Sequence, residues 1–294
     1  MFEITYTPFH IDVARYASDD FNPFHDKHKW QQIAGNPFGG PIALGFQLGA
    51  WLLEAVRDTR QQAGVAVTHR YSTLQIRYVD AVRAGDMLSA IVKPAFPESG
   101  GDGLSSRFVM KRNGRTAVLG SLRSSDRAPA TLPDEMAFAL ALDRLPDRSV
   151  VPDGAWFLKR KFMLTSNAKN FLSAAGVDAF RYFDELGDRV RFPELYPASL
   201  LSSALLERGL HHQHDFIRRP MVYSHHLITT DRTVLERLRS NDRLNLVVSE
   251  EADSDARLVH QCYAFTARGE RLFQAEIGLV TLASLAAAGV EQSA

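Results

Sequence analysis

The sequence predicts an α+β protein made of two tandem copies of one unit, each a long apolar helix wrapped by an antiparallel sheet. Similar segments recur at a nearly constant offset: Asp86 and Asp242 lie 156 positions apart in matching segments, and Pro41 and Pro197 share that offset. Each half also has one strongly apolar stretch after a proline, followed by alternating segments with turn signals between them. A fixed internal period of this kind indicates duplication of a structural unit.

The boundaries of the two copies follow from these landmarks. Gly114 and Gly269, each in a turn after an alternating segment, are offset by 155 positions. We therefore place the first copy at residues 1–128 and the second at 156–285. The intervening residues 129–155 are predicted to be a linker, and residues 286–294 a tail.

Each copy is expected to contain one buried helix and several strands. Residues 41–56 are apolar almost all round, which is typical of a helix buried on most sides, and Pro41 suits its first turn. The corresponding helix of the second copy is predicted at residues 197–210. Alternating polar and apolar residues predict strands in the first copy at residues 72–80, 87–92, 104–110 and 116–122. Two copies of this order are the pattern of a double hot-dog fold.

Composition narrows the function. The 294 residues include 34 basic and 34 acidic side chains, and 45% are hydrophobic. Nucleic acids and anionic membranes are held mainly by a surplus of Lys and Arg, so neither is expected as the main partner. Small molecules become the more plausible ligands.

The sequence shows no secretory or membrane signal, so a cytoplasmic protein is expected. The only cysteine, Cys262, has no partner for an intramolecular disulfide. The first residues lack the basic start and apolar stretch of a secretory signal, and no apolar run is long enough to suggest a membrane span.

The residues that carry chemistry concentrate between positions 18 and 45. Asp20, Asn22, Pro23 and His25 form an Asp-x-Asn-Pro-x-His motif, and a glycine-rich segment leads to Gly45 at the start of the apolar helix. This pattern resembles the signature of the MaoC-like (R)-specific enoyl-CoA hydratase/dehydratase family over about forty residues. The resemblance implies a hot-dog fold, a thioester of coenzyme A or acyl carrier protein as substrate, and reversible hydration of a 2-enoyl chain without metal or redox cofactor.

The same residues suit that chemistry on physical grounds. Hydration of a conjugated thioester needs a base for water, an acid for C2 and a donor to the thioester oxygen. Asp20 and His25 supply the acid and base, and Gly45 offers an N–H that intrahelical bonding leaves free. By resemblance this N–H takes the oxyanion position. The alternative is purely structural, with Asn22 as a helix cap and His25 as an ordinary half-buried histidine.

Several positions depart from the family pattern. Asp19 stands where the family usually has glycine, and we expect its carboxylate to affect the ionisation of Asp20. Lys27 replaces an aspartate, and Leu44 replaces a histidine that often precedes the oxyanion glycine. These substitutions are consistent with either weakened or redirected activity.

The second copy lacks the motif. Moving 156 positions from Asp20 and His25 leads to Gly176 and Arg181, so one site per chain is expected. The second copy is predicted to contribute its apolar helix to the wall of an acyl tunnel, and Arg181 is a candidate contact for a phosphate of the carrier.

Four further features are weighed as sites. The histidines at 211, 212 and 214 are read as a solvated helix end rather than a metal site, and His225 and His226 face opposite sides of a strand. The basic residues 159–161 are read as a solvated strand, with a carrier phosphate as the alternative. Glu54 is read as the end of the helix nearing solvent, although some hot-dog thioesterases use a carboxylate on this helix.

The leading hypothesis is a hydro-lyase with Asp20 and His25 as the acid-base pair, Asn22 orienting the loop and Gly45 polarising the thioester. Its rivals are a thioesterase using Glu54 or Asp20 as base, and a decayed thioester-binding protein. The chain is expected to act as a monomer or a homodimer.

Overall fold

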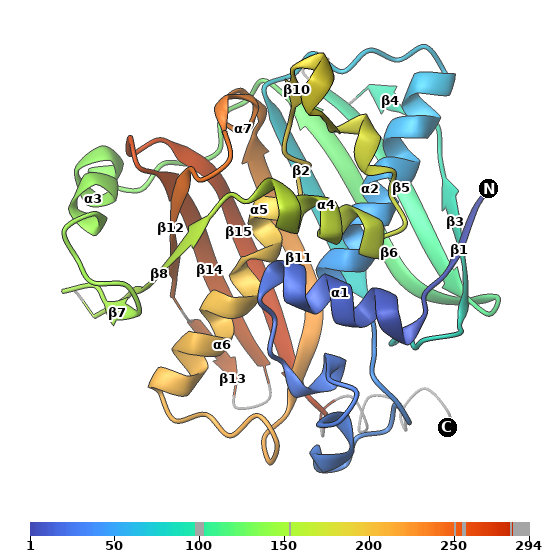
Figure 1. Ribbon diagram of the computed structural model, residues 1–294, viewed down its shortest axis with the longest axis horizontal. Helices are drawn as coiled ribbons and strands as arrows, with labels where there is room; N and C mark the ends of the chain where they lie inside the picture. Colours follow the sequence, from blue (N-terminus) through green and yellow to red (C-terminus); the bar gives the residue numbers. More distant parts are fainter. Residues whose placement is uncertain (98–102, 153, 250, 255–256, 283, 285–294) are drawn as a thin grey trace.

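The computed structural model describes residues 1–97, 103–152, 154–249, 251–254, 257–282 and 284. Most strands join one antiparallel sheet in the order β1-β3-β5-β6-β2-β11-β15-β14-β12-β8-β7, and helices α1, α4 and α6 lie in front of it in Figure 1. The predicted tail at 286–294 lies outside the described residues.

In its described residues the first copy contains six strands, two α-helices and two short 3₁₀ helices. In chain order its elements are β1 Phe2–Thr5, α1 Pro8–Ser18, η1 Pro23–His25, η2 Trp30–Gln32, α2 Gly45–Gln62, β2 Tyr71–Tyr78, β3 Met87–Val92, β4 Phe96–Pro97, β5 Gly103–Arg112 and β6 Arg115–Ser125.

The second copy repeats this order with small additions. Its elements are β8 Phe157–Phe162, α4 Thr165–Ala174, η3 Ala179–Arg181, β9 Phe183–Asp184, η4 Glu185–Gly187, β10 Arg189–Val190, α5 Tyr196–Ser199, α6 Leu201–His211, β11 Met221–Asp231, α7 Arg232–Arg237, β12 Arg243–Val248, β13 Glu251–Ser254, β14 Arg257–Thr266 and β15 Arg271–Thr281.

The segment between the copies has structure of its own. It contains α3 (Glu135–Leu142) and the short strand β7 (Ser149–Val150). Ala139 and Leu142 of α3 are buried against Leu158 and Phe265 of the second copy. Burial of these apolar side chains fixes the connection to the second copy.

The two copies meet where β2 pairs with β11. In this antiparallel register Thr73 lies opposite Thr229, and their hydroxyl oxygens are 3.0 Å apart. These two threonines are separated by 156 positions, the same offset that relates the two copies. The duplication therefore creates a local two-fold relation centred on this pair, and the two half-sheets become one continuous sheet.

Turns at matching positions follow the repeat. Asp86 accepts a hydrogen bond from the backbone N–H of Arg83, and Asp242 accepts the same bond from Arg239. Gly114 and Gly269 both have positive φ angles, +83° and +79°, which hairpin turns of this kind require of a glycine. The side chain of the repeated aspartate thus fixes the turn before β3 and before β12.

The predicted start of the first buried helix was wrong. Helix α2 begins at Gly45 rather than near Pro41, because Ile42 forms a β-bridge with Arg83 and the N–H of Ala43 donates to Val82 at 2.8 Å. These contacts keep the chain extended up to Leu44. The helix then continues to Gln62 and buries most of its side chains in the core. None of the helices in the described ranges is long and apolar enough to cross a membrane.

Candidate active site

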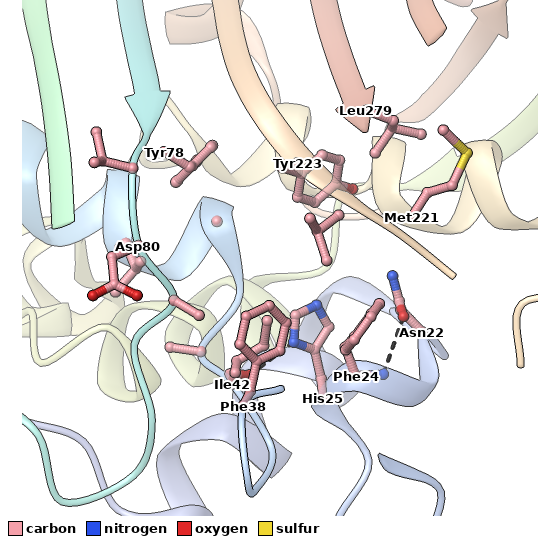
Figure 2. Close-up of a pocket in the computed structure, with 16 residues that line it drawn as sticks. Asn22, Phe24, His25, Phe38, Ile42, Tyr78, Asp80, Met221, Tyr223 and Leu279 are labelled. Atoms are coloured by element: carbon pink, nitrogen blue, oxygen red, sulfur yellow. Dashed lines mark hydrogen bonds between the residues drawn. The ribbon is translucent and has the colours of Figure 1, made fainter. Parts of the chain in front are cut away.

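The motif forms a turn between α1 and η1. Helix α1 ends at Ser18, and the C-cap residue Asp19 adopts a left-handed conformation with φ of 56°. The backbone N–H of Asp20 donates to the carbonyl oxygen of Arg15 at 2.8 Å. Asn22 caps η1, since its side-chain oxygen accepts the N–H of Phe24 at 3.1 Å, drawn as a dashed line in Figure 2. Pro23 occupies the first helical position, where a missing N–H is tolerated.

This turn brings Asp20 and His25 together in the protein interior. Oδ2 of Asp20 lies 3.9 Å from Nε2 of His25, and the two side chains are 1% and 4% exposed. Nδ1 of His25 lies 2.8 Å from the carbonyl oxygen of Ile42. Because a carbonyl can only accept, Nδ1 carries a proton, and Nε2 is the ring nitrogen that lies nearer to Asp20. Asp20 in turn accepts the N–H of Asn22 at 2.9 Å.

A buried ion pair supports the turn. Arg15 of α1 donates to Asp26 at 2.8 Å. Burial alone would raise the pKa of Asp26, but the backbone N–H groups of His28 and Lys29 and the charge of Arg15 hold this pKa below its ordinary value. Asp26 therefore ties α1 to the residues that follow His25.

A cavity of about 270 Å³ opens beside this pair (Figure 2). Asn22, His25 and Gly45 are part of its wall, together with Phe24, Phe38, Ile42, Ala43, Leu48, Tyr78, Val79, Asp80, Ala81, Met221, Val222, Tyr223 and Leu279. Asp20 is not among the residues of this wall. The structure thus gathers at one cavity the histidine, the asparagine and the glycine that the sequence singled out.

Gly45 is the first residue of α2, and its Cα faces side chains from two strands. A Cβ atom at this position would lie 2.7 Å from the hydroxyl oxygen of Tyr78 and 3.3 Å from Cε1 of His226. Only glycine fits without displacing Tyr78, and the N–H groups of the first helical turn have no intrahelical acceptor. The start of α2 can therefore offer a backbone donor to the cavity.

Three aromatic residues beside Gly45 were missed as site residues. Tyr78 lies on β2, whereas Tyr223 and His226 lie on β11 of the other copy. The rings of Tyr223 and His226 are 4.6 Å apart, and Tyr223 lines the cavity with Tyr78. No short motif connects these positions, so only the β2–β11 pairing brings them together. The prediction that His225 and His226 face opposite sides is confirmed, since His226 is buried and His225 contacts Glu276 at 2.9 Å.

A second cavity of about 300 Å³ adjoins the first. The two share Asn22, Met221, Tyr223 and Leu279 as wall residues. The rest of the second cavity is formed by the second copy, including Leu205, Leu206, Arg208, Gly209, His212, His214, Phe216, Arg219, Leu258 and His260. Two arms of space therefore diverge from Asn22, and helix α6 lines one of them.

The departures from the family pattern lie away from the cavity. The side chain of Asp19 is 63% exposed and contacts Lys161 at 2.5 Å, so it points to the surface rather than toward Asp20. Lys27 is half exposed and pairs with Asp12. Leu44 is buried and precedes α2 as its N-cap residue. The left-handed backbone of Asp19 is a conformation that glycine adopts with the least strain.

The loop of the second copy repeats two backbone features of the first, is one residue shorter and carries different side chains. Asp178 caps η3 by accepting the N–H of Phe180 at 2.9 Å, as Asn22 does in η1. The N–H of Val177 bonds to Leu172, which is the bond that Asp20 makes to Arg15. Val177 is therefore the structural counterpart of Asp20, one position beyond the Gly176 expected from the sequence. A carboxylate is missing from this position in either alignment.

Arg181 takes the place of His25 in the second loop, and its guanidinium pairs with carboxylates of helix α2. It contacts Asp58 at 2.5 Å and Glu54 at 3.5 Å on helix α2. The expectation that Glu54 marks a solvated helix end was wrong, because Glu54 is 8% exposed and also bonds Arg57 and Tyr182. Side chains of the second copy, Arg181 and Tyr182, cover this turn of α2. The local sequence of the helix gives no sign of this burial.

The basic residues 159–161 are not a solvated stretch either. Lys159 is buried and contacts Asp147 at 3.1 Å and Glu207 at 3.3 Å. These residues form β8, where neighbouring strands and α6 supply acidic partners. In the described part of the chain no group of three or more His, Cys, Asp or Glu side chains could hold a metal ion, and His211 and His212 are exposed.

Comparison with known proteins identifies the fold. No protein-family model and no curated protein match the sequence. Among solved structures, the chain is similar to a MaoC-like dehydratase with a TM-score of 0.62 and 11% identity, covering 95% of each chain. It is similar to a conserved hypothetical protein from Mycobacterium tuberculosis that has a double hotdog fold (TM-score 0.60, 13% identity), covering 95% of this chain and 94% of that one.

A third similar structure is a MaoC-like dehydratase from Phytophthora capsici, with a TM-score of 0.55 and 11% identity. The alignment covers 95% of this chain and 94% of that one. At these identities the comparisons establish the fold. The predicted α+β double hot-dog fold is confirmed.

Proposed function

We propose that this double hot-dog protein is a hydro-lyase that adds water to a 2-enoyl thioester, or removes it from the 3-hydroxyacyl product. The observation that carries the proposal is the buried pair of Asp20 and His25, with His25 and Gly45 in the wall of one cavity. Acid, base and oxyanion donor are then all supplied by the chain, so the reaction needs no metal or redox cofactor.

Asp20 and His25 act on one water molecule. The 3.9 Å between Oδ2 and Nε2 is too long for a direct hydrogen bond, but one water can lie within hydrogen-bond distance of both atoms. The bond from Nδ1 of His25 to Ile42 leaves Nε2 as the ring nitrogen that can contact this water. In hydration the pair takes a proton from water as its oxygen attacks C3, and returns a proton to C2. Positioned groups of this kind contribute typically ~10² to 10⁴-fold to a rate.

Gly45 stabilises the charge that forms on the substrate. When water attacks C3, the electrons of the double bond move toward the thioester oxygen. A backbone N–H at the start of α2 can donate to this oxygen, and the positive end of the helix dipole favours the charge. Asn22 holds the loop by capping η1 and by donating its N–H to Asp20.

The substrate is expected to extend into both arms of the cavity. One arm is lined mainly by residues of the first copy and the other by α6 and strands of the second. The two arms meet at Asn22, next to the reacting groups. We expect the acyl chain in one arm and the pantetheine of coenzyme A or acyl carrier protein in the other.

A panel of trans-2-enoyl thioesters, on coenzyme A and on acyl carrier protein, tests the proposal by mass spectrometry of the products. A 3-hydroxyacyl thioester supports it, whereas release of free thiol would indicate a thioesterase. Binding without any product would indicate a decayed enzyme. The thioesterase reading is weakened by Glu54, whose carboxylate is already paired with Arg57 and Tyr182 rather than facing the Gly45 cavity.

A further inference from the structure

Tyr78 and His226 form a hydrogen-bonded pair next to Gly45. The hydroxyl of Tyr78 lies 3.0 Å from Nδ1 of His226, and both rings belong to the two strands that join the copies. The contact of Tyr78 with the position of a Cβ at Gly45 places its hydroxyl directly beside the start of α2. Figure 2 shows Tyr78 and Tyr223 as neighbours in the wall of the cavity.

Burial fixes the charge state of this pair. Removal from water lowers the pKa of His226 to about 3, so its ring is neutral near pH 7. Burial also raises the pKa of Tyr78 well above its ordinary value, which keeps its hydroxyl protonated. Both groups are therefore uncharged while the enzyme works.

The position of the proton on His226 follows from its other nitrogen. Nε2 is buried and has no hydrogen-bond partner among the described residues. A buried N–H without an acceptor is rarer in proteins than a buried acceptor without a donor. The tautomer protonated at Nδ1 is thus favoured, and His226 then donates to the oxygen of Tyr78. This leaves the O–H of Tyr78 free to donate toward the cavity.

We propose that Tyr78 is a second donor to the thioester oxygen, beside the N–H of Gly45, and that His226 is a positioning residue that orients the Tyr78 hydroxyl. This inference rests on the proposed hydratase function. During water attack at C3, charge gathers on the thioester oxygen and is shared between the two donors. Tyr78 keeps its proton throughout, because the proton that ends on C2 comes from the Asp20 and His25 pair.

The first test is Tyr78→Phe, which removes the hydroxyl and keeps the ring. Loss of one oxyanion donor costs typically ~10² to 10³-fold in kcat, and we expect a fall of that size with little change in KM. The matched control is Tyr6→Phe, since the buried Tyr6 hydroxyl bonds Ala175 and lies outside both cavity walls. Wild-type kcat in Tyr78→Phe, with wild-type hydration intact, would overturn the proposal.

A spectroscopic test separates this inference from the hydration step. In an Asp20→Asn background the bound 2-enoyl thioester should persist, and its carbonyl stretch should appear at lower frequency than in solution. Adding Tyr78→Phe should return part of that shift. A Tyr78-dependent shift without any hydration by the wild type would overturn the proposed function alone. The inference would be overturned if the carbonyl shift were the same with and without Tyr78→Phe, or if no thioester bound.

The role of His226 is tested by two replacements. His226→Asn keeps an N–H donor near the place of Nδ1, whereas His226→Leu removes it. We expect His226→Leu to lower kcat about as much as Tyr78→Phe, and His226→Asn to retain most of it. Equal loss in both variants at unchanged melting temperature would contradict a positioning role.

Discussion

The loop after α1 in the first copy and the loop after α4 in the second have similar backbones and present different side chains. Both begin after a helix, and both cap a 3₁₀ turn with an Asx side chain. The first directs His25 at a cavity, and Asp20 lies 3.9 Å from it. The second has Val177 and Arg181 at these positions, and Arg181 forms ion pairs with Asp58 and Glu54.

The helices that follow these loops also start differently. In the first copy the chain is extended up to Leu44, so α2 begins at the cavity with Gly45. In the second copy the helical turn α5 (Tyr196–Ser199) stands directly before α6. Under the proposed function, the comparison predicts that a site needs two local features: a loop with the correct side chains, and a helix start that no preceding helical turn covers.

Removal of the acid-base pair has the largest expected effect. Asp20→Asn and His25→Ala should each lower hydration by ~10² to 10⁴-fold, because each takes away a group that handles the proton of water. Steady-state kinetics measure the loss, and circular dichroism checks that the fold is intact. Turnover near that of the wild type in both variants would refute the assignment.

Grafting the pair onto the second copy sharpens the comparison. Val177→Asp with Arg181→His, in the Asp20→Asn background, should not restore hydration, because α6 is preceded by α5 and offers no open helix start. Recovery of turnover toward the wild-type value would show that the loop alone makes a site.

Closing the helix start with a methyl group should have a somewhat smaller effect. Gly45→Ala forces the Tyr78 hydroxyl away from its place and should lower kcat by ~10²-fold, the scale of one oxyanion donor. Gly40→Ala is the matched control, since a Cβ at Gly40 meets nothing within 4 Å and its φ is not in the left-handed region. Equal activity of both alanine variants would contradict the close approach at Gly45.

The two caps should have equal effects on stability and unequal effects on rate. Asn22→Ala and Asp178→Ala each remove one capping bond, which costs typically ~1 kcal/mol of unfolding free energy. Only Asn22→Ala should also reduce turnover, since Asn22 lines the cavity. Urea denaturation and kinetics on both variants test this, and a cap variant as stable as the wild type would refute the capping role.

A pH dependence of stability is expected at the joint of the two copies. The pKa of His226 is lowered from 6.5 to about 3 on folding, so the unfolded chain binds a proton that the folded chain refuses. This contribution to stability is present above pH 6.5 and is lost progressively as the pH falls toward 3. Urea denaturation at several pH values should show a shallower acid loss in His226→Asn, and an identical slope would contradict it.

The sequence by itself determined the features that depend on local spacing. The strands β2 and β3 lie where the alternation predicted them. The matching aspartates at 86 and 242 indicated the duplication. The Asp-x-Asn-Pro-x-His spacing defined the turn that joins α1 to η1. Caps, turns and periodicity act over a few residues, so they can be read without the rest of the chain.

Only the tertiary structure decided what surrounds that turn. The start of α2 moved to Gly45 because Val82 and Arg83, some forty positions away, bind the preceding residues. Tyr78 and His226, separated by 148 positions, became neighbours through the pairing of β2 with β11. Such pairings are selected by burial and by hydrogen bonds across the whole sheet, and no short segment of the chain encodes them.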